Sequence, residues 1–251
     1  MVSIALATFN PTVVAVVLMA GVLRGFSGFG FSLAAVPLLS VILPLNAIVP
    51  LVLGLEAIGV LPTLGRIWRH TSWPVLGALL FGACLSMPIG LVILHQGAPA
   101  VLKPAVSMLV LGAVVLIWRP LDMDVQAGSG KGRAVVAGAI SGVLNGAMAM
   151  SGPPIILYML SSARAPEDTR ATMMLFFSLS AIVALVVGLA TRTYAPPQAG
   201  VFLWCLPFLA AGIEGGTLLR SRFSAERSRQ FALFALAVSA SASLFATVHF
   251  V

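Results

Sequence analysis

Charged residues are scarce in this chain. Only 8% of its 251 residues are Asp, Glu, Lys or Arg, whereas 60% are hydrophobic, and the mean hydropathy is +1.09. Soluble domains carry about 25% charged residues, so this composition excludes an ordinary soluble protein. Apolar runs of about 20 residues recur along the chain, and each is long enough to cross roughly 30 Å of hydrocarbon. The sequence therefore predicts an all-α integral membrane protein in a lipid bilayer.

Cysteine and histidine are also rare. The two cysteines, Cys84 and Cys205, lie within apolar runs, which argues against a disulfide and favours a packing role. Two cysteines and three scattered histidines form no metal-ligand cluster. No phosphate-binding loop is present, which excludes a nucleotide-driven pump. We expect neither a metal nor a cofactor.

The net charge of +7 comes from short loops between the apolar runs. Membrane proteins mark their cytoplasmic loops with Lys and Arg in this way, so we expect no nucleic-acid partner. The opening stretch "MVSIALATFNPTVV" has no Lys or Arg before the first apolar run. It therefore lacks the basic region of a cleavable signal peptide, and we expect it to be retained.

The pattern predicts about eight apolar segments, at 12–43, 45–64, 74–94, 104–118, 134–160, 171–190, 199–219 and 230–249. Two of them are too long for one crossing. Segment 12–43 would measure about 48 Å and segment 134–160 about 40 Å as helices, against roughly 30 Å of hydrocarbon. Both contain small residues in the middle, so each is predicted to be a broken helix whose second part folds back or continues at an angle.

The chain also resembles itself. Residues 1–120 and 134–251 are predicted to be two repeats of four segments each, joined by the polar linker 121–133. An even number of segments makes the two repeats parallel. This arrangement places six basic residues on one side and seven on the other, which leaves the orientation open. The aligned positions are Gly21 with Gly138, Gly25 with Gly142, Pro37 with Pro154, Gly90 with Gly216, and Lys103 with Arg229.

A broken helix inside the membrane indicates a binding site. Unpaired backbone amides are tolerated there only beside protein or a water-filled cavity. The N–H groups that begin the second half-helix carry partial positive charge, which favours an anion. In the first motif we expect Ser27, Gly28, Phe29 and Gly30 to line such a site. The alternative interpretation of the Gly-xxx-Gly spacings in both motifs is close helix packing.

The second motif, "GAISGVLNGAMAMSGPPIILYML", supplies the opposite wall of the predicted site. Ser151 is a predicted N-cap, with Gly152 and Pro153 in the first turn of the helix that follows. Asn145 can adopt left-handed backbone or donate its amide to a ligand. Gly146 completes this set.

Two ionisable residues lie in the middle of predicted spans. Arg24 costs about 2.5–3.5 kcal/mol at the membrane centre, so it needs a cavity and a partner. Its donors suit a sulfonate or carboxylate, and Glu56 is a candidate partner or proton carrier. A structural Arg24–Glu56 ion pair is the competing interpretation. Glu214, near a segment end, has a structural role in our interpretation.

The motifs "GVLRGFSGFGFSLAAVP" and "GVLNGAMAMSGPP" resemble those of the sulfite exporter TauE/SafE family, also called the toluene-sulfonate uptake permease family. The resemblance covers essentially the whole chain. It implies movement of a small sulfonate, sulfite or related anion across the bacterial inner membrane. Ala147–Met150 fill positions where the family commonly has glycine, so the particular anion stays open.

Taken together, these features predict a secondary transporter of a small organosulfur or sulfur-oxyanion that works by alternating access, and not an enzyme. An anion channel is one alternative. An intramembrane serine hydrolase is another, because "GFSG" places Ser27 in a G-x-S-G pattern. A serine nucleophile needs a base within hydrogen-bond reach, and the three histidines lie near segment ends. Proton coupling and a homodimer are compatible with the sequence but are not specified by it.

Overall fold

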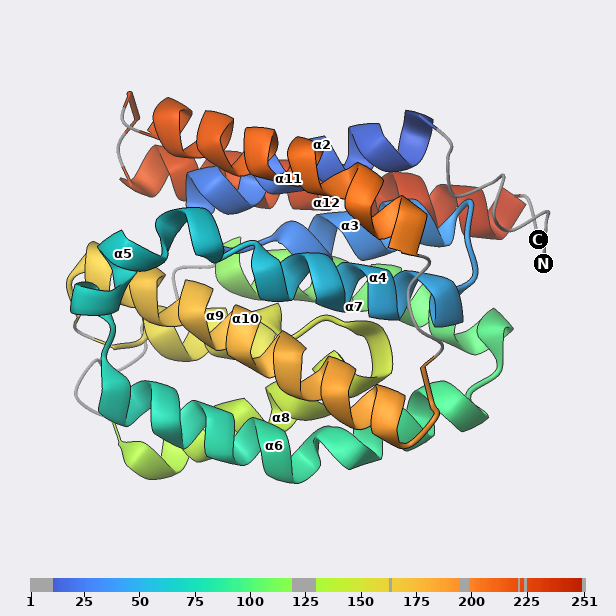
Figure 1. Ribbon diagram of the computed structural model, residues 1–251, viewed down its shortest axis with the longest axis horizontal. Helices are drawn as coiled ribbons and strands as arrows, with labels where there is room; N and C mark the ends of the chain where they lie inside the picture. The colour runs from blue at the N-terminus through green and yellow to red at the C-terminus, as the bar shows by residue number, and fades with distance from the viewer. Residues whose placement is uncertain are drawn as a thin grey trace.

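The computed structural model describes residues 11–118, 130–162, 164–194, 199–220, 222–223 and 225–249, and these residues contain helices but no strand. Short 3-10 turns at Leu61–Thr63 and Trp68–His70 flank α5. The helices are α2 (Pro11–Ser27), α3 (Phe31–Ser40), α4 (Leu45–Ile58), α5 (Leu64–Ile67), α6 (Trp73–Gln96), α7 (Pro99–Trp118), α8 (Lys131–Met148), α9 (Gly152–Leu160), α10 (Pro166–Ala190), α11 (Ala199–Arg220) and α12 (Ala225–His249), as Figure 1 shows.

Long apolar helices make this a multi-pass membrane protein. Within the residues that the structure describes, four helical stretches are long and apolar enough to cross a bilayer, namely Leu45–His70, Trp73–Gln96, Pro166–Ala190 and Ala199–Arg220. Large apolar side chains such as Phe81, Leu85 and Phe234 are exposed on the outside of the bundle, where lipid can solvate them. The short predicted segment 104–118 becomes a 20-residue helix, α7, because residues 99–103 extend it.

Both long segments are broken, as predicted. The first is interrupted between α2 and α3, where Gly28 has φ = 86° and Gly30 has φ = 97°. This left-handed backbone is accessible to glycine without the strain that a Cβ causes. The second is interrupted between α8 and α9, where Ala149 adopts φ = 55°. Of the two roles considered for Asn145, left-handed backbone does not occur, because α8 continues for one more turn and the positive φ falls on Ala149.

The second part of each broken segment folds back. Figure 1 shows α3 returning alongside α2 and α9 returning alongside α8. Each half of the chain therefore crosses the bundle an odd number of times. Two hydrogen bonds show how α4 and α10 are oriented relative to each other: Ser178 of α10 bonds to Glu56 of α4, and Thr172 of α10 bonds to Ser72 after α5. Along α10 the residue number falls from 178 to 172 while that of the bonded partner rises from 56 to 72. Helices α4 and α10 are therefore antiparallel.

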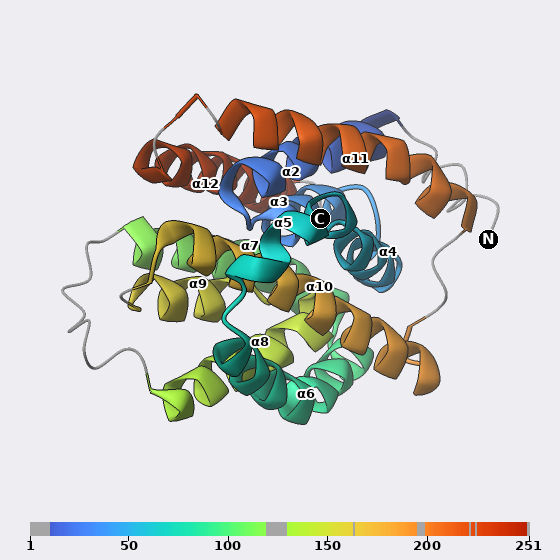
Figure 2. The same cartoon turned by 60° about the vertical axis from the view of Figure 1, so that its left-hand side comes forward.

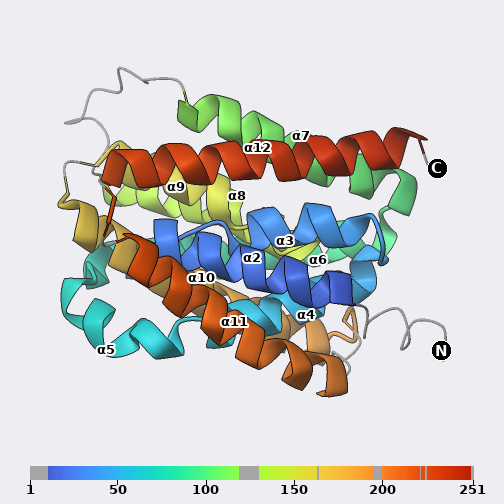
Figure 3. The same ribbon diagram turned by 90° about the horizontal axis from the view of Figure 1, so that it is seen from above.

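The predicted parallel orientation of the two halves is therefore wrong. The helices that the predicted repeats would pair, α4 with α10 and α7 with α12, run in opposite directions (Figure 3). The prediction counted each broken segment as one crossing, whereas the fold-back of α3 and α9 reverses every helix that follows. The packing is nevertheless reciprocal, since α6 packs extensively on α8 and α2 on α11 (Figure 2).

Glycines bring these two helix pairs into close contact. A Cβ on Gly25 would overlap the backbone of Ile213 in α11, and a Cβ on Gly138 would overlap the backbone of Leu79 in α6. Gly142 lies equally close to Ala83. The helix-packing interpretation of the Gly-xxx-Gly spacings therefore holds at these positions.

Basic residues gather at one end of the bundle, which we call the basic end. At this end α4, α7, α9 and α11 finish and α6, α8, α10 and α12 begin (Figure 1). Lys103 and Arg192 belong to the opposite end. The near-even split predicted from the sequence is wrong, because the fold-back of α9 moves later loops to the other side. The basic end carries, among the residues whose side chains are described, Arg66, Arg69, Lys131, Arg133, Arg164, Arg170, Arg220 and Arg222.

Candidate functional site

Arg24 and Glu56 form a buried ion pair. Arg24 lies in the last two turns of α2 with no exposed surface, and its Nη1 donates to Oε1 of Glu56 on α4. Its Nη2 donates to Oγ of Ser178 on α10 at 2.9 Å. Ser178 in turn donates to the backbone carbonyl of Glu56 at 2.8 Å. The geometry thus matches the interpretation of Arg24 and Glu56 as a structural ion pair. Together with Ser178, the pair joins three helices.

A cavity of about 240 Å³ lies beside the first break, at the basic end. The end of α2, α9, the first turns of α10 and the last residue of α11 surround it. The lining residues that the structure describes include three arginines and no carboxylate. The other walls of the cavity are mostly apolar. The lining residues are Phe26, Ser27, Phe29, Ile156, Met159, Leu160, Ser162, Arg164, Pro166, Thr169, Arg170, Met173 and Arg220.

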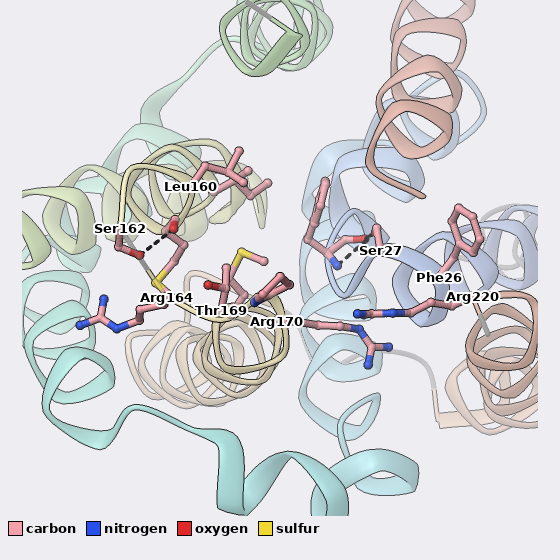
Figure 4. Close-up of a pocket in the computed structure, with 13 residues that line it drawn as sticks. Phe26, Ser27, Leu160, Ser162, Arg164, Thr169, Arg170 and Arg220 are labelled. Atoms are coloured by element: carbon pink, nitrogen blue, oxygen red, sulfur yellow. Dashed lines mark hydrogen bonds between the residues drawn. The ribbon is translucent and has the colours of Figure 1, made fainter. Parts of the chain in front are cut away.

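Arg170 and Arg220 dominate this cavity electrostatically. Figure 4 shows their side chains extending toward one another from α10 and α11, while Arg164 points away from them. Arg170 Nη2 donates to the carbonyl of Gly25 at 2.7 Å, and its buried Nε has no hydrogen-bond partner. In the described part of the chain neither Arg170 nor Arg220 has a carboxylate within ion-pair distance. These donors are therefore available to an anion.

The first motif contributes part of this site. Ser27 and Phe29 line the cavity. Gly28 lies against Arg170, because a Cβ there would overlap the Cγ of that arginine. Gly30 begins α3 behind the cavity and is not among its lining residues. Arg24 does not line it either, because its donors face Glu56 and Ser178.

The geometry gives little support to Ser27 as a nucleophile. Its hydroxyl lies 2.7 Å from the carbonyl of Leu23 and 2.6 Å from that of Phe29. His70 pairs instead with Asp168 at 3.1 Å. Among the described residues, no histidine hydrogen-bonds to Ser27, so the base that a serine hydrolase needs is not at hand.

The second break lies toward the opposite end of the bundle. Tyr194, in the loop after α10, donates its hydroxyl to the carbonyl of Gly146 at 2.8 Å. Asn145 is buried on α8, and its Nδ2 has no hydrogen-bond partner among the residues that the structure describes. Burial raises the pKa of the Tyr194 phenol, so its hydroxyl stays protonated and can donate.

The other predicted residues of the second motif support the break itself. Ser151 occupies the N-cap position of α9, but its side chain forms no cap hydrogen bond, and its carbonyl instead accepts a bond from Ser141 at 2.7 Å. Gly152 and Pro153 form the first turn of α9. Gly152 packs against Leu33 of α3, so the two folded-back helices meet there. None of these residues lines the cavity, whose wall from α9 comes from later positions.

The sequence interpretation missed the arginines that line the cavity. Arg164, Arg170 and Arg220 were assigned to loops, because each lies at the edge of an apolar run. The period of the run does not reveal which way an arginine at its edge will point. The signal that the sequence offers is the density of basic residues, since these arginines belong to the loops that carry most of the charge.

Known proteins resemble this chain in sequence. The family model for "Sulfite exporter TauE/SafE" matches residues 13–243. The "Probable sulfite/organosulfonate exporter TauE" of Cupriavidus necator is 26% identical over 121 residues, which span 46% of this chain and 46% of that protein. The match thus covers about half the length of this curated relative. No solved structure matches the chain. Because the family model covers nearly the whole sequence, the chain belongs to the sulfite exporter TauE/SafE family.

Proposed function

We propose that this protein exports a small sulfur-containing anion, sulfite or an organosulfonate, across the bacterial inner membrane. The observation that carries the proposal is the cavity beside the first break, whose described lining contains three arginines and no carboxylate. Membership of an exporter family supports it, and so does the name of the relative from Cupriavidus necator. Export by a carrier also agrees with the apolar, multi-pass fold.

The lining of the cavity suits an organosulfonate. The planar forks of Arg170 and Arg220 match the oxygen atoms of a sulfonate or sulfite group. Thr169 and Arg170 belong to the first turns of α10, where the helix dipole adds positive potential. Met159 and Met173 offer an apolar surface for the carbon part of the substrate. At about 240 Å³ the cavity is smaller than the roughly 300–1,000 Å³ typical of drug-sized ligands, so the cargo is a small ion.

The distribution of charge sets the orientation that we propose. Short loops rich in Lys and Arg stay in the cytoplasm during insertion. Eight described basic residues lie at the basic end and two, Lys103 and Arg192, at the opposite end. The basic end therefore faces the cytoplasm. The cavity lies at that end, as an exporter needs in the state that loads its substrate.

We further propose that the protein works by alternating access between two inverted repeats, residues 1–120 and 134–251. Inverted repeats with broken helices place a site between the halves and expose it to each side in turn. The cavity at the first break lies on the basic side. The second break is covered on the opposite side by Tyr194, which is 3% exposed and whose ring packs on Gly188. A site that is open at the basic end and covered at the opposite end corresponds to an inward-facing state.

Glu56 is our candidate for the coupling site. Protonation of Glu56 would remove the charge that holds Arg24, which joins α2 to α4 and α10. Proton binding would then loosen a contact between helices of different halves. In this proposal Arg24 acts through Glu56 and need not touch the substrate.

Flux measurements on proteoliposomes test the proposal. Radiolabelled sulfite and sulfoacetate are loaded on the side of the basic end, for the wild type beside Arg170→Gln and the control Arg222→Gln, an exposed arginine that does not line the cavity. We expect saturable flux, with kcat/KM reduced about 10- to 100-fold in Arg170→Gln, because hydrogen bonds between charged groups contribute about 1.5–3 kcal/mol. Absence of flux of either anion would refute the substrate class. Non-saturating flux would favour a channel.

A further inference from the structure

A second, larger cavity lies at the basic end, outside the first. Its volume is about 480 Å³, and it lies between α5, the start of α10 and the end of α11. The surrounding residues are Arg66, Ile67, His70, Glu167, Arg170, Ala171, Thr217 and Arg220. We refer to it as the outer cavity, and to the cavity of about 240 Å³ beside the first break as the inner cavity.

Arg170 and Arg220 line both cavities, so the two spaces share a wall. Arg66 lines the outer cavity alone and is exposed, which places it on the solvent side. Arg66 is the most exposed of the three arginines that line the outer cavity, and we infer that an ion from the basic end arrives there first. Arg170 and Arg220 lie between that point and Ser27 at the first break.

The outer cavity has an excess of unpaired positive charge. Of the lining residues that the structure describes, three carry guanidinium groups and one, Glu167, carries a carboxylate. Asp168, the next residue of α10, hydrogen-bonds to His70 at 3.1 Å and is not among the described lining residues. Among the described residues, none of the three arginines forms an ion pair. Like charges that share a cavity repel one another, and an anion bound between them removes that repulsion.

We propose that the outer cavity is a capture site for the transported oxyanion, separate from the inner cavity. The anion binds first between Arg66 and the outer faces of Arg170 and Arg220. It then passes to the inner faces of the same two arginines. Because these arginines line both cavities, the anion stays in contact with them as it moves. The site would accept small oxyanions in general, and the apolar lining of the inner cavity would then discriminate among them.

This proposal rests on the proposed transport function, and a matched pair of variants separates the two. Arg66 and Arg69 are both exposed arginines three residues apart, but only Arg66 lines the outer cavity. We expect Arg66→Gln to raise KM for sulfite about tenfold with kcat nearly unchanged, because the capture step is weakened and the later steps are not. Arg69→Gln should leave KM within about twofold of the wild type. The KM of the wild type should rise with ionic strength, and that of Arg66→Gln should rise less.

Calorimetric titration of the purified, detergent-solubilised protein supplies a readout that does not depend on transport. With sulfite we expect two ions per wild-type chain and one per chain of Arg66→Gln. Sulfate, which has no carbon part, should fill the outer site as well. Equal KM values for Arg66→Gln and Arg69→Gln, or one ion per chain in the wild type, would overturn the capture site and leave the transport proposal standing. A wild type that binds two sulfite ions but moves none would overturn the transport proposal alone.

Discussion

The guanidinium group of Arg24 and the carboxylate of Glu56 lie against each other in the interior of the bundle, with 0% and 6% of their side-chain surface exposed. Arg24 belongs to the broken first segment, and Glu56 to the helix that follows it. Gly59 leaves the space for this arrangement, because a Cβ there would lie 3.2 Å from Nε of Arg24. Each charge is thus compensated by the other in a region that water does not reach.

The first prediction concerns this pair. Arg24→Gln or Glu56→Gln alone should lower the free energy of unfolding by about 3–5 kcal/mol, because each leaves the partner as an uncompensated buried charge. The double variant should be more stable than either single variant. Thermal unfolding in detergent, analysed as a double-mutant cycle, measures this. Additive losses in the double variant would show that the two groups are not coupled.

The second prediction concerns the turn at the first break. Gly28→Ala should cost about 1–2 kcal/mol of stability, because a residue with a Cβ is strained at φ = 86°. It should also displace Arg170, whose Cγ occupies the space that the Cβ needs, and so raise KM for the anion. The control is Gly112→Ala on α7, where a Cβ meets no atom within 4 Å and Ala is the better helix former. Equal stability and equal KM in both variants would contradict the role of Gly28.

The sequence predicts much of the fold for identifiable reasons. Segment length predicts the two breaks, since a span of 32 residues cannot stay straight in a bilayer. The spacing of Gly21 and Gly25 predicts a close helix contact. Opposite charges in mid-span predict the pairing of Arg24 and Glu56. Each of these inferences depends on local constraints that hydrocarbon imposes on any chain.

The sequence cannot predict features that depend on the direction of the chain. A length argument does not say whether α3 and α9 fold back or continue, and that choice reverses all the helices that follow. The error about parallel halves and the near-even charge count both have this cause. Arg170 and Arg220 were overlooked for a related reason, because only the tertiary arrangement turns these residues from segment ends toward a common cavity.

The third prediction separates the two kinds of substrate. Met173→Gln keeps the length of the side chain but replaces an apolar thioether in the inner cavity with an amide. The KM for an alkyl sulfonate should rise about tenfold, which corresponds to the loss of contact with roughly two CH₂ groups. The KM for sulfite, which has no carbon, should change little. Competition of each anion against labelled sulfite measures this, and a parallel rise for both would show that Met173 does not select the carbon part.

The fourth prediction tests the orientation. In a variant without its natural cysteines (Cys84→Ala, Cys205→Ala), T193C should react with a membrane-impermeant maleimide in intact cells, because Thr193 lies in the loop at the opposite end. R222C, at the basic end, should react only after the cells are opened. The reverse pattern would place the basic end outside and would exclude loading from the cytoplasm through the inner cavity.

The fifth prediction concerns Tyr194, whose hydroxyl donates to the carbonyl of Gly146 near the second break. Helix α8 ends at Met148, so its last carbonyl groups need partners from outside the helix. The N–H of Met150 bonds to the carbonyl of Leu144 at 3.4 Å, and the Tyr194 hydroxyl donates to the carbonyl of Gly146. Tyr194→Phe should cost about 1 kcal/mol in the state described here. The matched control is Tyr158→Phe, because the buried hydroxyl of Tyr158 has no hydrogen-bond partner.

The same loss should shift the carrier toward its outward-facing state. A change of about 1 kcal/mol alters a two-state equilibrium roughly fivefold, so S151C at the second break should react about five times faster from the outside when Tyr194→Phe is added.

The pH dependence of stability gives an independent check. Burial raises the pKa of Tyr194 above its usual value of about 10. Above that pH the unfolded chain binds fewer protons than the folded one, so the contribution of Tyr194 to stability falls as pH rises. Tyr194→Phe should remove this alkaline loss and Tyr158→Phe should keep it. Identical labelling rates and alkaline profiles in the two variants would show that Tyr194 does not hold the opposite end closed.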